Sequence, residues 1–348
     1  MRPPEGFGNI VMPPQTRLDE PRYQGKAGDM TAEQVEYVIQ QEDAGERLDV
    51  VVVRALRGRA GRARVRDLFE SRLVLVQGRE ATKGWRARPG DVLTIRLASI
   101  DPKAVPEPAA ALDIRLERSD LVVVNKPAGQ PSCPLRPKEI GTLANALVGR
   151  YPEMADIGYD PREPGLIHRL DTGTSGLLLA ARTPSAFDYL TRDLRAGKIE
   201  KHYLAICESD GMADSGIIDI PIGIDPKHPK RVVACLRAEE LRRYDPRPAR
   251  TKYSVKQRLG RWALLMVQAP KAVRHQIRAH FAAIDHPLAG DAQYGGDTRI
   301  LKRHALHAVS IAWNGRQDVQ GFEVSCGMPE DLSAFLQDAS IPIPEHDS

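Results

Sequence analysis

The first hundred residues change repeatedly between strand-like and helix-like spacing of apolar side chains. Short apolar or alternating runs predict strands, which are expected at 35–40, 73–76 and 92–95. Apolar residues three or four positions apart predict helices at 47–56 and 62–70. Residues 34–99 are therefore expected to fold as a small α+β domain.

The rest of the chain contains short apolar runs and amphipathic stretches that do not follow a regular strand–helix repeat. Strands are expected at 121–124, 177–180, 203–206 and 263–267, and helices at 185–196 and 274–284. Each helix has one apolar face, formed by Phe187, Leu190 and Leu194 in the first and by Ile277, Phe281 and Ile284 in the second. Residues 113–336 are therefore predicted to form one α+β unit.

Proline-rich stretches separate and flank these two units. Residues 1–33 carry five prolines and no apolar period, which predicts a disordered or loosely docked tail. Residues 100–112 are rich in proline and alanine and are expected to be a linker, and residues 337–348 are expected to be a second tail.

The composition is that of a globular protein without a membrane-spanning segment. Of the 348 residues, 42% are hydrophobic and 28% are charged, and no apolar run approaches the roughly 20 residues that a span needs. The N-terminus lacks the apolar core of a signal peptide, and the four cysteines have no metal or disulfide spacing. A cytoplasmic, monomeric protein with reduced thiols is therefore expected.

Positive charge is concentrated in two stretches, although the net charge of the chain is only +4. Residues 54–88 contain eleven lysines and arginines against three acids, and residues 227–252 contain nine against three. Such clusters are expected where a protein contacts the phosphate backbone of a nucleic acid. A solvated basic face without a ligand is the alternative for each stretch.

The first basic stretch surrounds three short motifs of a known RNA-binding module. They are, in order, Glu46-Arg-Leu-Asp49, Val74-Leu-Val-Gln-Gly78 and Arg88-Pro-Gly-Asp-Val92. In these residues the domain resembles the module named after ribosomal small-subunit protein four, which implies RNA contacts by Arg62, Arg64 and Arg66. A generic α+β adaptor domain is the alternative.

One aspartate stands in the most distinctive segment of the chain, residues 165–180. Asp171 lies between the cationic pair His168 and Arg169 and the glycine-rich turn Thr172-Gly-Thr-Ser-Gly176, which leads into an apolar run. Such a turn can present a reactive carboxylate at the end of a strand.

An aspartic protease site and a metal site are two functions that this segment could suggest. Aspartic proteases use two carboxylates that share a proton, and Asp214-Ser-Gly216 offers a second Asp-x-Gly pattern. The two aspartates are only 43 residues apart, too few for one lobe each, so a protease is disfavoured. A metal site of His168, Asp171, His275 and His280 is disfavoured as well, because His275 and His280, five apart on one helix, would diverge by about 140°.

The interpretation that accounts for all of these features, including the two basic stretches, is nucleophilic or acid–base chemistry by Asp171 on a base of RNA. A carboxylate that stays ionised in a partly dry cleft needs a fixed cation beside it. Arg278 is the candidate, because it lies about 100° around the helix from the buried residue Ile277 and can border the cleft. Arginine keeps its proton and can hold a carboxylate through two hydrogen bonds.

Seven motifs in the expected order resemble the RluA family of pseudouridine synthases over residues 36–336. They are Val122-Val-Val-Asn-Lys-Pro-Ala-Gly129, His168-Arg-Leu-Asp-Thr-Gly-Thr-Ser-Gly176, Lys201-His-Tyr-Leu-Ala205, Pro248-Ala-Arg-Thr-Lys-Tyr253, His275-Gln-Ile-Arg278, His286-Pro-Leu-Ala-Gly-Asp291 and Leu306-His-Ala308. The resemblance implies a pseudouridine synthase fold with a central mixed, mostly antiparallel sheet and a catalytic cleft. It also implies isomerisation of uridine to pseudouridine in structured RNA, without a cofactor or a metal ion.

The resemblance also implies roles for individual residues. Asp171 would be the catalytic aspartate, Arg278 its ion-pair partner, and Tyr203 a ring that stacks on the target base. Arg169 would fill the space that the uridine leaves when it flips out of its stack. Further RNA contacts are expected from His168, Lys201, Arg274 and His275.

One motif departs from the family pattern. The family places a Gly-Arg pair just before the His-Gln-Ile-Arg motif, and this chain has Ala272 and Val273 there, with Arg274 one position later. The departure concerns an RNA contact rather than Asp171 or Arg278. It leaves open a non-catalytic RNA-binding or ribosome-assembly factor derived from a synthase. The presence of the N-terminal module favours ribosomal RNA over transfer RNA as the substrate.

Overall fold

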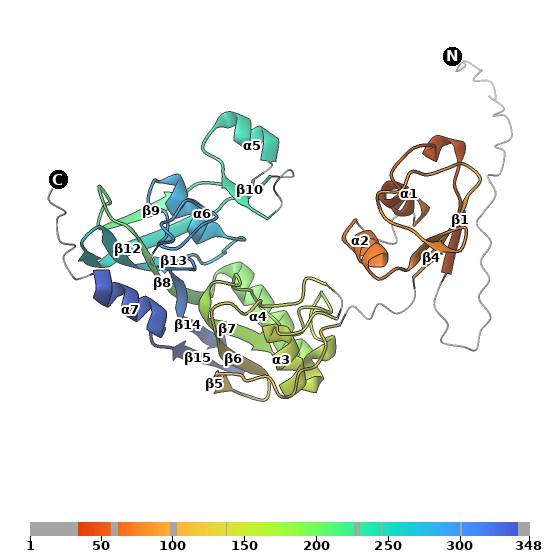
Figure 1. The fold of residues 1–348 in the computed structure, drawn as a ribbon. Coiled ribbons are helices and arrows are strands. Elements are labelled where there is room, and N and C mark those ends of the chain that lie inside the picture. Colours follow the sequence, from red (N-terminus) through yellow and green to blue (C-terminus); the bar gives the residue numbers. More distant parts are fainter. Residues whose placement is uncertain are drawn as a thin grey trace, which may run out of the picture. The chain divides into compact units, whose positions relative to one another are not determined.

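The computed structural model describes residues 34–56, 62–97, 103–136, 138–225, 228, 230–244, 246–299 and 301–339. These residues belong to two compact units, Met1–Asp101 and Pro102–Ser348 (Figure 1). The tail predicted at residues 1–33 lies outside the described residues.

The described part of the first unit is a four-stranded antiparallel sheet with two α-helices and one short 3-10 helix. Its strands are β1 (Gln34–Val38), β2 (Val74–Val76), β3 (Arg79–Glu80) and β4 (Val92–Arg96), in the order β1-β4-β2-β3, and its helices are η1 (Gln41–Asp43), α1 (Leu48–Ala55) and α2 (Arg62–Glu70). Val52 of α1, Leu68 of α2 and Leu93 of β4 are fully buried in one core. All five predicted elements are present, and the short strand β3 and helix η1 are additions to them.

The second unit is built on a nine-stranded sheet in which, among the described strands, only β7 and β14 run parallel. Its strands are β5 (Ile114–Glu117), β6 (Leu121–Lys126), β7 (Ser175–Ala181), β8 (Ile199–Glu208), β9 (Ser215–Asp219), β12 (Arg250–Leu259), β13 (Trp262–Gln268), β14 (Leu306–Arg316) and β15 (Val319–Ser325). They follow the order β5-β6-β7-β14-β8-β13-β12-β9, and β15 pairs with β14. The predicted mixed, mostly antiparallel sheet is confirmed.

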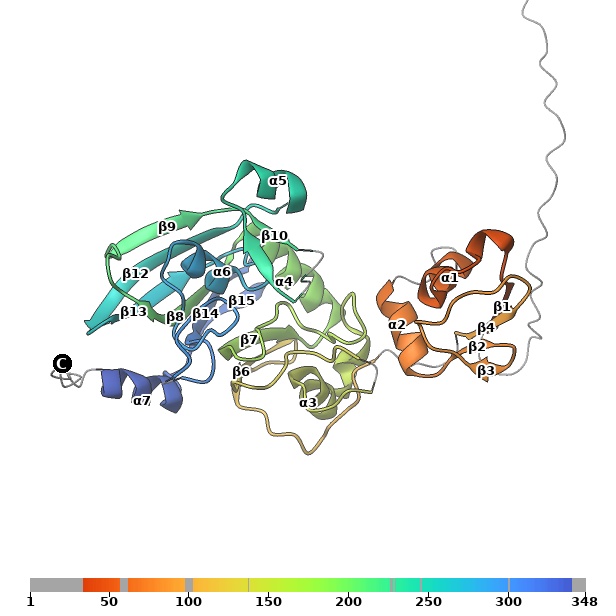
Figure 2. The same ribbon diagram turned by 45° about the horizontal axis from the view of Figure 1, so that its top comes forward.

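Helices and one small ribbon surround this sheet. They are α3 (Leu143–Arg150), η2 (Pro152–Asp156), α4 (Pro184–Ala196), the ribbon of β10 (Ile222–Ile224) and β11 (Val232–Ala234), α5 (Ala238–Tyr244), α6 (Gln276–Ala283) and α7 (Glu330–Ala339). Helix α5 buries none of its residues and stands away from the sheet in both views (Figures 1 and 2). Within the part of the chain that the structure describes, no helix is long and apolar enough to cross a bilayer.

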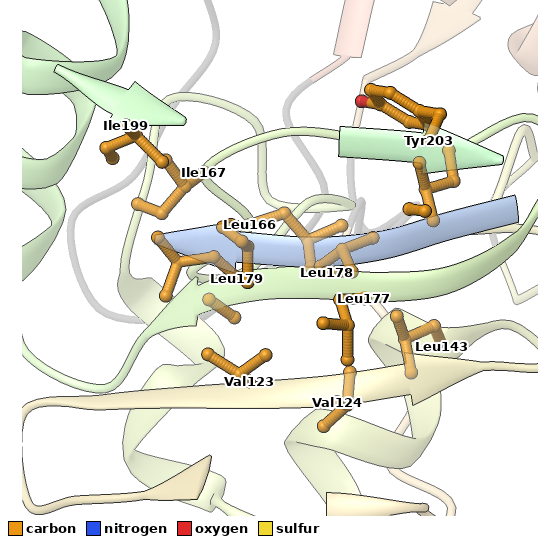
Figure 3. Packing of buried hydrophobic residues seen from close by; sticks show 14 of the residues in the cluster. Val123, Val124, Leu143, Leu166, Ile167, Leu177, Leu178, Leu179, Ile199 and Tyr203 are labelled. Atoms are coloured by element: carbon orange, nitrogen blue, oxygen red, sulfur yellow. The ribbon is translucent and has the colours of Figure 1, made fainter. Parts of the chain in front are cut away.

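Strands β6 and β7 form the centre of the core. Residues 121–124 are fully buried, and all seven residues of β7 are buried as well. Figure 3 shows Val124 and Leu177 of these neighbouring strands close to Leu143 of α3. A strand that is covered on both faces needs apolar residues at every position, which is why these two appear in the sequence as continuous apolar runs.

The stretch predicted as a linker packs against the second unit. Ala104 is only 4% exposed, and Glu107 N donates to Asn145 O at 3.0 Å. The Asn145 side chain donates to Val105 O at 2.8 Å, and a Cβ on Gly149 would lie 2.3 Å from the Glu107 backbone. Described residues 103–112 therefore differ from a free linker, because helix α3 gives them a surface to pack on. The tail predicted from 337 onward likewise begins inside α7.

Candidate active site

A tight turn places Asp171 immediately before strand β7. Thr174 N donates to Asp171 O at 3.0 Å, which closes the turn. Gly176 has a φ of 113°, and a Cβ there would lie 2.3 Å from Ala308 O, so glycine is needed for β7 to approach β14 this closely. The Asp171 side chain is left 24% exposed at the end of the strand.

Arg278 of α6 lies beside Asp171 and is held by a second carboxylate. Its Nη1 donates to Asp171 Oδ2 at 2.9 Å. Its Nε and Nη2 donate to the two oxygens of Asp291 at 2.8 and 2.9 Å. The bidentate partner of Arg278 is therefore Asp291, whereas Asp171 receives one hydrogen bond from it. The expectation of two hydrogen bonds to Asp171 is corrected in this respect.

Asp291 is a buried site residue that the sequence reasoning missed. It is only 1% exposed, and Gln293 Oε1 beside it accepts a further hydrogen bond from Arg278 at 3.0 Å. The Tyr294 ring centre lies 5.0 Å from the guanidinium carbon. Burial acts to lower the pKa of Arg278, but the hydrogen bonds and charges of its two carboxylates outweigh burial and raise it. The signal in the sequence was the acid that ends the motif at residues 286–291.

Tyr203 of β8 shares a pocket with Asp171. The pocket has a volume of about 60 Å³, and Ile277, Leu306 and Arg278 also line it. Tyr203 is only 5% exposed. Burial first, and then the negative charge of Asp171, raise its pKa, so the phenol keeps its proton at neutral pH. The pocket thus joins one carboxylate, one fixed cation and one aromatic face.

Arg169, His168 and Lys201, which were expected to contact RNA, differ in how far they are exposed. Arg169 lines the pocket with half of its side chain exposed, and its Nη1 donates to Glu163 Oε1 at 2.6 Å. His168 turns inward, where its Nε2 accepts from Leu179 N at 3.2 Å. Lys201 is 6% exposed, and burial lowers its pKa to about 8. Lys201 is therefore buried, and His168 is half-buried with its Nε2 bound to the backbone, so the fold presents neither side chain as an exposed cation.

His275 and Arg274 lie at the start of α6. His275 Nε2 is 3.8 Å from Asp171 Oδ1, and its Nδ1 is 3.1 Å from the Tyr294 hydroxyl. Burial lowers the pKa of His275 despite the opposing effect of the Asp171 charge. Arg274 is exposed, and its Nη2 donates to Lys230 O at 2.9 Å. His275 is therefore next to the carboxylate, whereas Arg274 lies on the surface.

The two residues that depart from the family pattern also line this pocket. Ala272 and Val273 are part of its wall. Val273 N donates to Gln276 Oε1 at 3.0 Å, which helps to begin helix α6. A small apolar surface thus stands where the family pattern has a cation.

The predicted basic helix of the first unit is α2. Arg66 is exposed on it, Arg64 is partly exposed, and the side chain of Arg62 lies outside the described residues. A cavity of about 490 Å³ beside the helix is lined by Arg66, Phe69, Glu70, Arg72, Glu80, Ala81, Thr82 and Lys83. This surface combines cations with one aromatic side chain.

The first half of the Asp171 turn is held by residues 126–132. Ser132 Oγ donates to Leu170 O at 2.7 Å and accepts from Leu170 N at 3.1 Å. Gly129 N donates to Thr172 O at 2.8 Å. The buried Lys126 Nζ is 3.4 Å from the same carbonyl. The backbone on both sides of Asp171 is therefore fixed.

Two buried histidines bind the hydroxyls in the second half of the turn. His304 Nε2 is 2.8 Å from Thr174 Oγ1, and His307 Nδ1 is 2.9 Å from Ser175 Oγ. Burial lowers the pKa of both imidazoles from 6.5 to about 4. Both rings are therefore neutral at pH 7.

The free energy of unfolding is expected to decrease as the pH falls from 6.5 toward 4. In this window the unfolded chain binds a proton at each of these histidines and the folded protein does not, so protonation favours unfolding. One histidine contributes at most about 1.4 kcal/mol per pH unit. Urea unfolding at about pH 7 and about pH 5.5 should show a smaller decrease for His307→Asn than for the wild type. Equal decreases would contradict the assignment.

The residues that an aspartic protease site or a metal site would need do not come together. Asp214 is 86% exposed and receives a hydrogen bond from Arg258 at 2.8 Å. His280 is 2.8 Å from both Thr251 Oγ1 and Ile220 O. Neither a two-aspartate protease site nor a chelating histidine pair is therefore assembled within the described residues.

Relatives of the chain share one description. A family model described as RNA pseudouridylate synthase matches residues 120–283. An uncharacterized RNA pseudouridine synthase of Chloroflexus aurantiacus is 34% identical over 310 residues, which are 88% of this chain and 94% of that protein. Ribosomal large subunit pseudouridine synthase D of Nitrosomonas europaea is 31% identical, and the match covers 87% of each chain.

A solved structure agrees with them in fold. The human protein RNA pseudouridylate synthase domain containing 4 is 22% identical, with a TM-score of 0.51 over 67% of this chain and 94% of that one. The second unit thus has the pseudouridine synthase fold. Together with the extent of the sequence matches, this shows that the chain belongs to the RluA family of RNA pseudouridine synthases, which isomerise uridine to pseudouridine.

Proposed function

We propose that this enzyme modifies ribosomal RNA and that Asp171 is its catalytic residue. The observation that supports Asp171 is a single, partly exposed carboxylate, paired with the buried cation Arg278, at the wall of a pocket shared with Tyr203. Arg278 fixes the Asp171 carboxylate in place by a hydrogen bond at the wall of this pocket, where the carboxylate can act as a nucleophile or a base.

The reaction sets what the site has to do. The bond between uridine N1 and ribose C1′ breaks, a bond between C5 and C1′ forms, the C5 hydrogen leaves as a proton, and N1 gains a proton. The atoms balance without an oxidant or a cofactor. Asp171 is the carboxylate at the site that can attack the nucleoside or accept the C5 proton, and Arg278 holds it by a hydrogen bond during the reaction.

Tyr203 and Arg169 are proposed to hold the RNA around this reaction. A base in a paired stack cannot turn to present C5, so the uridine has to leave the stack. The buried Tyr203 ring offers a π-face for the flipped base. The exposed Arg169 side chain at the same pocket can occupy the space that the base leaves.

The first unit is proposed to bind RNA through the basic surface of α2. Arg66 and the neighbouring Lys83 and Arg72 line one cavity there, and Phe69 adds an aromatic edge. Contacts to the phosphate backbone supply affinity without sequence specificity. A non-catalytic RNA-binding factor would not need Asp171, Arg278 and Asp291 arranged as an ion triad, so we favour the enzyme.

Ribosomal RNA is proposed as the substrate because three relatives carry the name ribosomal large subunit pseudouridine synthase D. They are 30% or 31% identical to this chain. The cytoplasm is proposed as the location of the enzyme. Mapping of pseudouridines in total RNA from cells with and without the protein is expected to show loss of a site in large-subunit ribosomal RNA. Loss in transfer RNA alone would refute the ribosomal substrate and leave the reaction intact.

A further inference from the structure

The turn of Asp171 is held from its far side by an arginine that follows 130 residues later. Arg303 Nη1 donates to Gly173 O at 3.1 Å, and the Arg303 side chain is only 13% exposed. The same Nη1 is 3.3 Å from His304 O and from Leu306 O. One guanidinium edge thus joins the Asp171 turn to the backbone that leads into β14.

The opposite edge of Arg303 is held by helix α7. Its Nε and Nη2 donate to Asp331 Oδ2 and Oδ1 at 2.6 and 2.9 Å. Asp331 stands in the first turn of α7, where its Oδ1 also accepts from Leu332 N at 3.0 Å. Leu332 and Phe335 of the same helix are buried, so α7 is firmly docked and Asp331 is placed accurately.

Without Asp331 the guanidinium would have room to move. A cavity of about 640 Å³ is lined by Gly173, Arg303, Asp331 and Phe335, among others. An arginine that loses a bidentate carboxylate also loses the fixed plane that aims its remaining N–H group. Asp331 is thus the group that directs Arg303 Nη1 toward Gly173 O.

We propose that Arg303 is a positioning residue for Asp171 and that Asp331 acts through it. The proposal rests on the proposed catalytic role of Asp171. The Asp171 carboxylate has to meet Arg278 and the nucleoside at the same time, and Gly173 lies two residues from it on the turn. A displacement of a reacting group by about 1 Å can lower the rate about 100-fold. The hydrogen bond from Arg303 to Gly173 O therefore affects the rate of the chemical step rather than RNA binding.

The test measures tritium release from ribosomal RNA transcripts labelled at uridine C5. Asp331→Asn is expected to lower kcat by about 10- to 100-fold and to leave KM within about twofold of wild type. Arg303→Lys should do the same, because lysine lacks the fork that joins two partners. The double variant should be no worse than the more affected single variant, since both residues act through one contact.

The matched control is Asp120→Asn. Asp120 also receives two hydrogen bonds from one arginine, Arg118, at 2.9 and 2.8 Å, and both are partly buried away from the Asp171 pocket. It should lose similar thermal stability and keep its kcat. Wild-type kcat in Asp331→Asn, or an equal loss of kcat in Asp120→Asn, would overturn the positioning role alone. A wild-type enzyme that releases no tritium would overturn the proposed function itself, and this inference with it.

Discussion

Asp171→Asn is expected to lower pseudouridine formation by roughly 1,000-fold or more. Asparagine keeps the shape of the side chain and its hydrogen bond from Arg278, but it has no negative charge with which to attack a nucleoside or accept a proton. Binding to the RNA should stay close to wild type or become slightly tighter, because a negative charge is removed near the phosphates. Tritium release and filter binding on the same transcript measure the two effects separately.

The chain supplies its own control for this experiment. Asp214 begins the second Asp-x-Gly segment and is 86% exposed beside Arg258. Asp214→Asn should leave both the rate and the affinity unchanged. If Asp171→Asn still isomerised uridine, or if both variants were equally impaired, the catalytic role of Asp171 would have to be abandoned.

Arg278→Met is expected to lower both the free energy of unfolding and the activity. Asp291 would keep its buried position but lose both hydrogen bonds from the guanidinium. Removing one partner of a buried ion pair costs about 3–5 kcal/mol. The rate should fall as well, because the Asp171 carboxylate would lose the hydrogen bond from Arg278 that holds it in place. Urea unfolding and tritium release give the two quantities.

A second substitution separates these two effects. Asp291→Asn in the Arg278→Met background removes the unpaired buried charge, so part of the lost stability should return. Activity should not return, since Asp171 still lacks its cation. Recovery of activity together with stability would show that Arg278 only supports the fold. No recovery of stability would show that Asp291 is not the origin of the loss.

The local pattern of apolar residues predicted where helices and strands form better than it predicted which segments pack against one another. Helix α2 and strands β6 and β7 were located because their apolar runs are set by local burial. Helix α3 was missed, and with it the surface that holds residues 103–112. The spacing of apolar residues predicts that a segment is buried, but it does not predict which other segment packs against it.

The candidate site shows the same limit at the level of single residues. Asp171 and Arg278 could be paired from charge and helical position, and the resemblance supplied Tyr203. Asp291 was not assigned a role. The positions of Asp171 and Asp291 in the sequence do not reveal which of the two accepts two hydrogen bonds from Arg278. The resemblance implied an RNA contact by His168, yet the Nε2 of its ring accepts a hydrogen bond from the Leu179 backbone.

The parallel pair of β7 and β14 has a consequence for the order in which the protein is made. Thr174 and its partner His304 are 130 residues apart, so the turn of Asp171 cannot be completed until the later strand has been synthesised. At about 5–20 residues per second, that delay is on the order of 10 s. The described strands of the first unit lie within residues 34–96, so this unit can fold during this time. A nascent chain therefore has a finished N-terminal domain several seconds before it has a catalytic centre.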